Sequence, residues 1–354
     1  MLKEVMVLLT DRELLILKAI VQIYTDDGQP VGSKALVSKL PIHVSSATIR
    51  NEMATLEEMG LLKKTHSSSG RVPSIKGYRY YVDHLLKPDK VQSSDLRKIR
   101  SSFNQQFQEI DDIVAESADM LSQLTSYTAF TVKPELKDAK LEGFRLVPLG
   151  NHRVMAILVT DNGSVQNRTF KVPKNVNPEA LESVIRIIND QLVGLTLGEV
   201  FKRLETDIPI QVGKYIETPE GFLDVFEEIL KKSSTEHFFV GGRLNLLNFS
   251  KHPDPSSIRS LYSLMGRSTD LASVLGGSLD HNIQVQIGNE ITNNLLKNYS
   301  LITATYDVDQ HGKGVIAILG PTSMPYSRMI GLVGAFRTEL AQRLIDYYHD
   351  IDDI

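Results

Sequence analysis

The stretch Ser45-Ser46-Ala47-Thr48-Ile49-Arg50-Asn51-Glu52-Met53-Ala54-Thr55-Leu56 decides how the first third of the chain folds. Ile49, Met53 and Leu56 recur at the spacing of one helix face, and Gly60 follows as a helix-ending residue. The stretch therefore predicts a short helix that buries this face against neighbouring elements.

The other side of the same helix is small and polar. Ser45 and Ser46 offer hydroxyls that cap a helix start. Thr48 fits a DNA major groove without a steric barrier, and Arg50 and Asn51 have the chemistry to bind guanine and adenine edges. The alternative is an ordinary solvated helix face.

Two further helices are predicted before this one. Thr10 and Glu13 form a capping box at the start of a first helix, which Gly28 ends. Ser33 is expected to cap a short second helix that stops at Pro41. Three short capped helices are also compatible with any small helical bundle.

The residues after the third helix favour a DNA-binding domain. Leu61 to Thr65 reads as a strand, residues 66–71 as a basic Ser/Gly-rich tip, and Val72-Pro73 as the return strand. Three helices followed by a basic hairpin is the order of a winged helix, whose third helix enters the major groove while the wing contacts phosphate. Lys64 and Arg71 are candidate phosphate contacts, although ordinary surface charges would look the same.

Charge is unevenly distributed along the chain. The whole protein of 354 residues has a formal net charge of -4, which argues weakly against nucleic-acid binding. Between Lys34 and Arg79, however, eight basic residues face three acidic ones, a local charge of +5. The sequence predicts one basic domain in an otherwise acidic protein.

Composition sets the broad class. Hydrophobic content of 42% and charged content of 23% are those of globular proteins, and the length favours more than one domain. No apolar run approaches the roughly 18 residues of a membrane span, no signal peptide is recognisable, and there is no cysteine. We expect a cytoplasmic protein that does not associate with membranes.

The remaining two thirds predict an α+β region. Residues 88–103 are polar and read as a linker into a helix from about Asn104 to Leu124. Short β-branched segments from Leu141 to Val172 are separated by Gly-Asn and Asn-Gly turns, which predicts antiparallel hairpins. Segments with helical periodicity follow. Strands are predicted after them, and in one of these Ile283, Val285 and Ile287 are expected to face a core. The chain ends in a long predicted helix.

Signals for an enzyme are weak. His311-Gly312-Lys313-Gly314 lacks the spacing of a phosphate loop, and Asp307 to Asp309 lacks the glycine and glutamate of a calcium loop. The nine histidines show no zinc-binding spacing, and Gly288-Asn289-Glu290 reads more simply as a turn than as a binding loop. We expect no catalytic residues, no metal and no cofactor.

Several motifs together resemble a known family, the heat-inducible transcription repressor HrcA. The N-terminal motifs are residues 45–53, 56–62, 69–73 and 77–83, and the later ones are residues 241–249, 287–290 and 320–322, in the family's order. One departure is Ser323, where the family usually has an arginine before the methionine.

The resemblance implies a multidomain α+β fold and a function. It implies a winged helix-turn-helix in residues 1–87, the linker 88–103, a GAF-like domain with an antiparallel sheet in 104–206 and 280–354, and an inserted dimerising domain in 207–279. It also implies a homodimeric repressor of the groE and dnaK chaperone operons that binds the CIRCE inverted repeat and is modulated by the GroE chaperonin. The residues expected to contact DNA are Lys34, Ser45, Ser46, Thr48, Arg50, Asn51, Lys64, Ser69 and Arg71.

A second function stays open at this point. A GAF-like domain often hosts small molecules, so the chain could be a winged-helix regulator that senses a ligand there. Fold analogy alone does not establish such a site.

Overall fold

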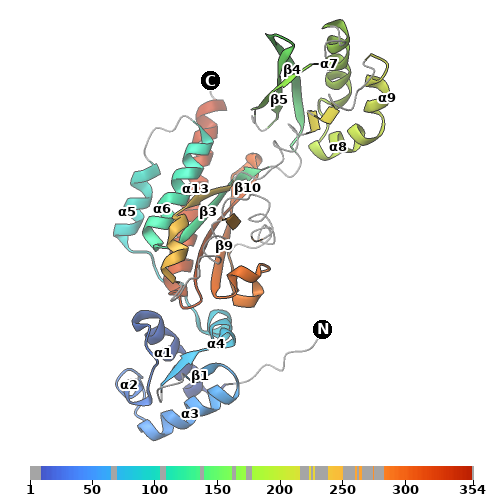
Figure 1. Cartoon of the computed structure of the whole chain (residues 1–354). Coiled ribbons are helices and arrows are strands. Elements are labelled where there is room, and N and C mark those ends of the chain that lie inside the picture. The colour runs from blue at the N-terminus through green and yellow to red at the C-terminus, as the bar shows by residue number, and fades with distance from the viewer. Residues whose placement is uncertain are drawn as a thin grey trace. The chain divides into compact units, whose positions relative to one another are not determined.

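The computed structural model divides the chain into two compact units (Figure 1). The main unit comprises Met1–Lys133, Phe238–Tyr306 and Gly314–Ile354, and the inserted unit comprises Pro134–His237 and Asp307–Lys313. The structure describes residues 9–64, 70–103, 109–135, 139–161, 165–172, 178–215, 223–224, 226–227, 238–249, 260, 263–264, 274 and 283–352.

The main unit begins with the predicted winged helix. Its elements are α1 (Asp11–Asp27), α2 (Ser33–Val37), α3 (Ser46–Glu58), β1 (Leu62–Lys64), β2 (Arg71–Pro73) and α4 (Ile75–Tyr80). The capping box at Thr10 and Glu13 is confirmed, and Gly28 ends α1 at φ 66°. The expected cap of α2 is wrong: Gly32 is the N-cap, without a side-chain hydrogen bond, and Ser33 is already helical.

Three helices enclose the winged-helix core. Ile16, Ile20, Leu36, Ile49 and Leu56 are all completely buried. Because these apolar positions recur at helical spacing, burial of one face per helix accounts for the packing that the sequence predicts.

A five-stranded sheet forms the centre of the rest of the main unit. Its strands are β3 (Thr128–Glu135), β7 (Phe238–Gly241), β8 (Ile283–Ile287), β9 (Tyr299–Asp307) and β10 (Lys313–Pro321), in the spatial order β7-β3-β10-β9-β8. β7 pairs antiparallel with β3, and β8 pairs antiparallel with β9. Because β3 and β10 are neighbours at the centre, this sheet is complete only after the chain returns from the inserted unit.

Helices cover one face of this sheet (Figure 1): α5 (Ser93–Phe103), α6 (Ile110–Thr125) and α13 (Tyr326–Asp352). Phe103 of α5 packs edge-on against Phe336 of α13, with ring centroids 5.5 Å apart. At the edge strand β8, Ile287 is fully buried as expected, whereas Ile283 and Val285 are only partly buried. The sheet and its helices form the domain that the resemblance describes as GAF-like, and the α+β multidomain fold is confirmed.

The expected linker is largely helical. Most of residues 88–103 belong to α5, and Ile99 and Phe103 bury their side chains. The segment looks polar in the sequence because few of its side chains face the core.

The inserted unit pairs a three-stranded antiparallel sheet with helices. The strands are β4 (Leu141–Gly150), β5 (Arg153–Thr160) and β6 (Val165–Lys171), and the helices include α7 (Pro178–Leu192), α8 (Leu197–Thr206) and α9 (Ile208–Val212). Phe144 and Leu158 from the sheet share a core with Ile188 and Val200 from the helices.

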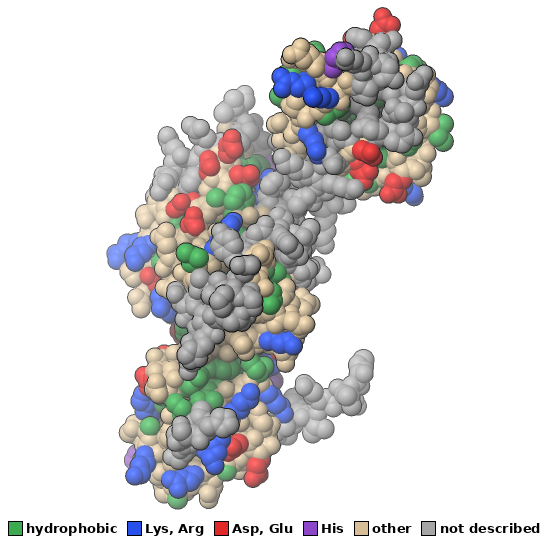
Figure 2. Space-filling view, in the orientation of Figure 1, with side chains coloured by type: hydrophobic (Ala, Val, Ile, Leu, Met, Phe, Trp, Pro, Cys, Tyr) green, Lys and Arg blue, Asp and Glu red, His purple; other side chains and the backbone are tan. Residues whose placement is uncertain are grey.

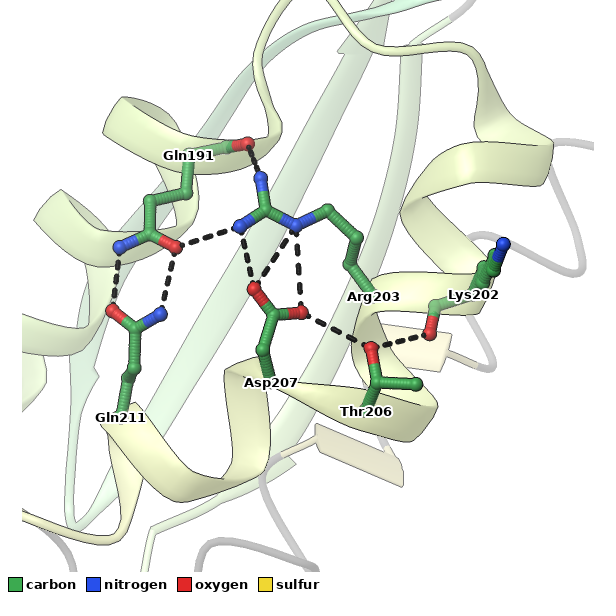
Figure 3. A network of polar contacts seen from close by, with 6 residues as sticks. All are labelled: Gln191, Lys202, Arg203, Thr206, Asp207 and Gln211. Carbon is green, nitrogen blue, oxygen red and sulfur yellow. Dashed lines mark hydrogen bonds and ion pairs between the residues drawn. The ribbon is translucent and has the colours of Figure 1, made fainter.

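A polar network joins the ends of these helices (Figure 3). The Arg203 guanidinium donates to Asp207, to the Gln191 carbonyl at 2.9 Å and to Gln191 Oε1 at 3.1 Å. Gln211 of α9 also donates to Gln191 Oε1, at 2.9 Å. Arg203 thereby ties α8 to the end of α7, and Gln191 ties α7 to α9.

The boundaries of the insertion differ from those expected. The compact inserted unit begins at Pro134, within the last two residues of β3, whereas the expected bounds put residues 104–206 in the GAF-like domain and the insertion at 207–279. The hairpins β4 to β6 alternate like any antiparallel strands, so their pattern does not tell which sheet they join. Much of 207–279 lies outside the described residues.

Candidate DNA interface

Helix α3 presents one buried face and one exposed face, as predicted. Ile49, Met53 and Leu56 are at most 2% exposed, whereas Arg50 and Asn51 lie on the solvent side. Side chains on this exposed face are free to contact base edges.

Hydroxyls at the start of α3 have structural partners. Ser45 Oγ accepts a hydrogen bond from the Thr48 amide at 3.1 Å and lies 2.9 Å from the Thr48 hydroxyl. Ser46 Oγ lies 2.9 Å from Ser33 Oγ in α2. The Ser45 contacts cap α3, and the Ser46 contact joins α3 to α2, so all three predicted hydroxyl residues have a structural role in the helix-turn-helix.

The wing is a short hairpin with exposed lysines. Leu62, Lys63 and Lys64 pair with Pro73, Val72 and Arg71 respectively. Both lysines are exposed. Ser69, also predicted to contact DNA, lies outside the described residues.

Arg71 is held by an acidic partner. Its Nε and Nη2 both donate to Glu57 Oε2 at 2.7 Å, and its side chain is only 12% exposed. Its backbone also pairs with Val31, with N···O distances of 2.9 Å in both directions. The structure therefore uses Arg71 to join the wing to the end of α3 and to the segment before α2.

A second ion pair joins α1 to α3. The Arg12 Nε donates to Glu52 Oε1 at 2.8 Å, and Nη2 contacts the same oxygen. The pair offsets an acidic charge on α3, which would otherwise repel phosphate. No local sequence pattern indicates this contact, because its partners are 40 residues apart.

Exposed cations come from three elements of the winged helix. Lys34 of α2, Arg50 of α3 and Lys63 and Lys64 of β1 are all exposed. Figure 2 shows Lys and Arg side chains concentrated over the winged helix, on the side where Figure 1 places α2 and α3. Lys63 was not singled out from sequence, although it lies directly beside Lys64 on the wing.

The described residues also bear on other classes of site. In the part of the chain that the structure describes, no group of three or more His, Asp or Glu side chains is placed to hold a metal ion. No described helix is long and apolar enough to cross a membrane. A polar cavity of about 390 Å³ lies between α1 and the start of α13, lined by residues that include Gln22, Asp26, Tyr81 and Arg328.

An exposed recognition helix and a basic wing, joined to a separate α+β region, define a DNA-binding transcription regulator. Comparison with known families agrees. Residues 8–83 match the winged helix-turn-helix transcription repressor, HrcA DNA-binding family, and residues 111–330 match the HrcA protein C-terminal domain family.

Known relatives cover nearly the whole chain. The heat-inducible transcription repressor HrcA of Limosilactobacillus reuteri (strain DSM 20016) is 57% identical over 349 residues, 98% of this chain and 100% of its own length. That of Enterococcus faecalis is 54% identical over 343 residues, 96% of this chain and 99% of its own. The chain belongs to the HrcA family of heat-inducible transcription repressors.

A solved structure shows a related fold. A crystal structure described only as that of a hypothetical protein is 23% identical, covers 96% of this chain and 98% of its own, and superposes with a TM-score of 0.57. At this identity the likeness supports the fold and says nothing about function.

Proposed function

We propose that the protein is a cytoplasmic repressor of the groE and dnaK heat-shock operons that binds the CIRCE inverted repeat as a homodimer, with activity modulated by the GroE chaperonin. The observation that carries this proposal is the exposed Arg50 and Asn51 face of α3 beside a wing with Lys63 and Lys64, in a chain of the HrcA family. The operator and the chaperonin are taken from the family resemblance.

The proposed contacts divide into two kinds. Arg50 and Asn51 are assigned to base edges, because Arg pairs with guanine and Asn with adenine through paired hydrogen bonds. Lys34, Lys64, Ser45, Ser46, Thr48 and Ser69 are assigned to the sugar-phosphate backbone. Arg71, which pairs with Lys64 next to the tip of the wing, is assigned to joining the wing to α3 through Glu57.

A homodimer fits an inverted repeat, because a two-fold axis in the protein then matches that of the operator. The outer face of the inserted sheet supports a role in pairing. On that face Val147 lies opposite Met155, and Val165 opposite Val159. Val147 is 40% and Val165 56% exposed. A mixed sheet face of this kind, with Arg145 and Asn167 on the same side as the two apolar pairs, is a candidate protein contact.

The test is binding to a CIRCE duplex and to a scrambled duplex over a range of salt concentrations, with and without GroE. We expect preference for CIRCE by at least about 10³-fold, and affinity that falls as salt rises because phosphate contacts release counterions. Equal binding to both duplexes would overturn the proposed operator, and an unchanged active fraction with GroE would overturn the proposed modulation.

The second proposed function is ligand sensing in the GAF-like domain. The cavity of about 390 Å³ touches that domain at the start of α13, and its other lining residues include Gln22 and Asp26 of α1. A thermal shift of the full chain against a panel of metabolites tests it. A reproducible rise in Tm with one metabolite, lost in the charge-reversed variant Asp26→Lys, would favour a ligand. No change in Tm with any metabolite would favour regulation by proteins alone.

A further inference from the structure

Helix α4 is built rigidly into the winged helix. The Ser74 hydroxyl donates to the Gly60 carbonyl at 2.6 Å and accepts from the Gly77 amide at 2.9 Å. A Cβ on Gly77 would lie 2.0 Å from the Leu61 carbonyl oxygen, so only glycine allows this approach. Any displacement of α4 therefore moves the wing with it.

The other side of α4 contacts the five-stranded sheet through one arginine. Arg79 Nη1 donates to the Val285 carbonyl in β8 at 2.7 Å and to Glu290 Oε2 at 3.1 Å. Nε and Nη2 of Arg79 donate to Asp83 at 3.0 and 2.6 Å. We call Arg79, Asp83, Val285 and Glu290 the Arg79 cluster.

The acidic partner on the sheet is itself held in place. Glu290 Oε2 accepts from the Ile287 amide at 2.8 Å, which anchors it to the turn Gly288–Glu290. Gly288 has φ 60°, and a Cβ there would lie 3.2 Å from Ile75 Cδ1 and 3.0 Å from the Lys297 carbonyl oxygen. The turn that the sequence analysis left without a role thus packs against the first residue of α4.

A second contact lies beside the first. The rings of Tyr78 in α4 and Tyr326 in α13 have centroids 5.9 Å apart. The Tyr326 hydroxyl lies 2.7 Å from Ser300 Oγ and donates to the Thr322 carbonyl at 2.8 Å. Three motifs of the resemblance, residues 77–83, 287–290 and 320–322, meet at this place.

The chain leaves α4 through an unusual turn. Tyr81–Leu85 is π-helical, a rare conformation that often marks functional positions. Beyond it the Asp89 amide donates to the Ser327 carbonyl at 3.0 Å, and a Cβ on Gly331 would lie 2.3 Å from the Asp89 carbonyl oxygen. The segment after α4 is therefore also fixed to the start of α13.

Charge makes Arg79 the centre of the contact. Its side chain is 27% exposed and lies between two carboxylates, those of Asp83 and Glu290. Burial lowers the pKa of Arg79, but hydrogen bonds and charge attraction from Asp83 and Glu290 raise it overall. Removal of this guanidinium leaves two carboxylates and the Val285 carbonyl without their common donor.

We propose that the Arg79 cluster sets the position of the winged helix on the α+β domain, and so the separation of the two recognition helices in a dimer. Arg79 and Glu290 are then positioning residues for operator binding, although neither touches DNA. This inference rests on the proposed binding of a dimer to an inverted repeat. Half-site spacing is a geometric property of such a dimer, so a loosened joint should relax it.

The test measures affinity for three duplexes: CIRCE, CIRCE with five base pairs added between its arms, and a single arm. The variants are Arg79→Ala, Glu290→Gln and Arg79→Lys, and the control is Arg97→Ala, which removes an exposed arginine from α5. The readout is the ratio of affinity for CIRCE to affinity for the lengthened repeat.

We expect Arg79→Ala to lower this ratio by about tenfold, because a loose joint loses effective concentration at the correct spacing and tolerates the wrong one. Affinity for the single arm should stay within about twofold of the parent, because α3 and the wing are unaltered. Glu290→Gln should show the same change to a smaller extent, and Arg79→Lys should restore part of the ratio because it keeps the charge. Arg97→Ala should match the parent.

An unchanged ratio in Arg79→Ala and Glu290→Gln would overturn the positioning role. So would an equal loss for all three duplexes, which would indicate damage to the winged helix itself. A parent protein that binds the repeat no better than the single arm would instead refute the proposed dimeric operator binding, on which the inference rests.

Discussion

At the scale of single residues, the structure separates side chains that are free to bind from those that are engaged. Arg50 is exposed on α3, whereas Arg71 is mostly buried against Glu57. From sequence the two arginines are equivalent candidates, because the Glu57 partner lies 14 residues away and is brought close only by the fold.

This difference gives a prediction for substitutions to alanine. Arg50→Ala should remove discrimination of about 1–3 kcal/mol at one base position. Lys64→Ala should weaken binding to all sequences and lower the salt slope by about 1. Arg71→Ala should leave that slope near the parent's value and instead lower the free energy of unfolding by about 1 kcal/mol. Salt-dependent binding and urea unfolding measure these effects; a reduced slope in Arg71→Ala would assign this arginine to phosphate.

Tyr78 and Tyr326 allow a matched pair of substitutions. The Tyr78 hydroxyl is buried and has no hydrogen-bond partner among the described residues, whereas the Tyr326 hydroxyl has two. Burial raises the pKa of both, so both hydroxyls stay protonated. Tyr78→Phe should raise the free energy of unfolding by about 1 kcal/mol, and Tyr326→Phe should lower it by about 1–3 kcal/mol. Urea denaturation decides this; destabilisation by Tyr78→Phe would reveal a partner for its hydroxyl.

At the scale of elements, local signals predicted the winged helix well. Helix α3 was recognisable because its cap, its apolar spacing and the glycine after it all lie within a few residues of one another. The sequence does not reveal helix α5, because Ile99 and Phe103 are its only buried side chains and a polar helix resembles a linker.

The candidate site was only partly predictable for the same reason. Exposed positions such as Arg50 and Lys64 follow from periodicity, but partners such as Glu57 for Arg71, Glu52 for Arg12 and Glu290 for Arg79 depend on tertiary packing. The last pair is 211 residues apart in the chain. No local pattern could assign it.

Close packing at α4 predicts an asymmetric response to added methyl groups. Gly77→Ala places a Cβ against the Leu61 carbonyl and should cost about 1–3 kcal/mol, because backbone must move. The matched change Gly198→Ala in α8 meets no atom within 4 Å and should be neutral or stabilising by up to about 1 kcal/mol. Thermal unfolding of both variants provides the test. A Gly77→Ala variant as stable as the parent would mean that α4 is not packed against the Leu61 carbonyl.

The network of Figure 3 predicts a pH dependence in the inserted unit. The hydrogen bond from Arg203 holds the pKa of Asp207 below its ordinary 3.8. A carboxyl with a lowered folded pKa stabilises the fold above its unfolded pKa and loses that contribution as the pH falls through the folded value. Because both side chains are more than one third exposed, the contribution is below about 1 kcal/mol.

Asp207→Asn should therefore be less stable than the parent at neutral pH, and the difference should shrink as the pH falls below the ordinary pKa of 3.8 and through the lowered folded pKa. Urea unfolding at a series of pH values measures it. A difference that persists in acid would show that Asp207 acts through geometry rather than charge.

At the scale of the whole molecule, the chain passes through the inserted unit before it completes the main unit. The sheet is completed by β10 only after the inserted unit has been traversed, so the insertion cannot be a terminal appendage. If two copies pair through the inserted unit, as we propose, the link raises the effective concentration of the second winged helix at the second arm of an inverted repeat.

This arrangement predicts that dimer formation and operator affinity are lost together. Val165→Lys places a charge beside Val159 on the outer face of the inserted sheet and should weaken the dimer, because a charge is costly to bury in an interface. The matched change Ile210→Lys alters another exposed apolar residue of the same unit, 71% exposed on α9. Sedimentation velocity should show monomers for Val165→Lys and dimers for Ile210→Lys. Affinity for the inverted repeat should fall in Val165→Lys alone, and affinity for a single arm should not change in either variant. Loss of the dimer in Ile210→Lys instead would place the interface on the helical side of the unit, and an intact dimer in both variants would place it elsewhere.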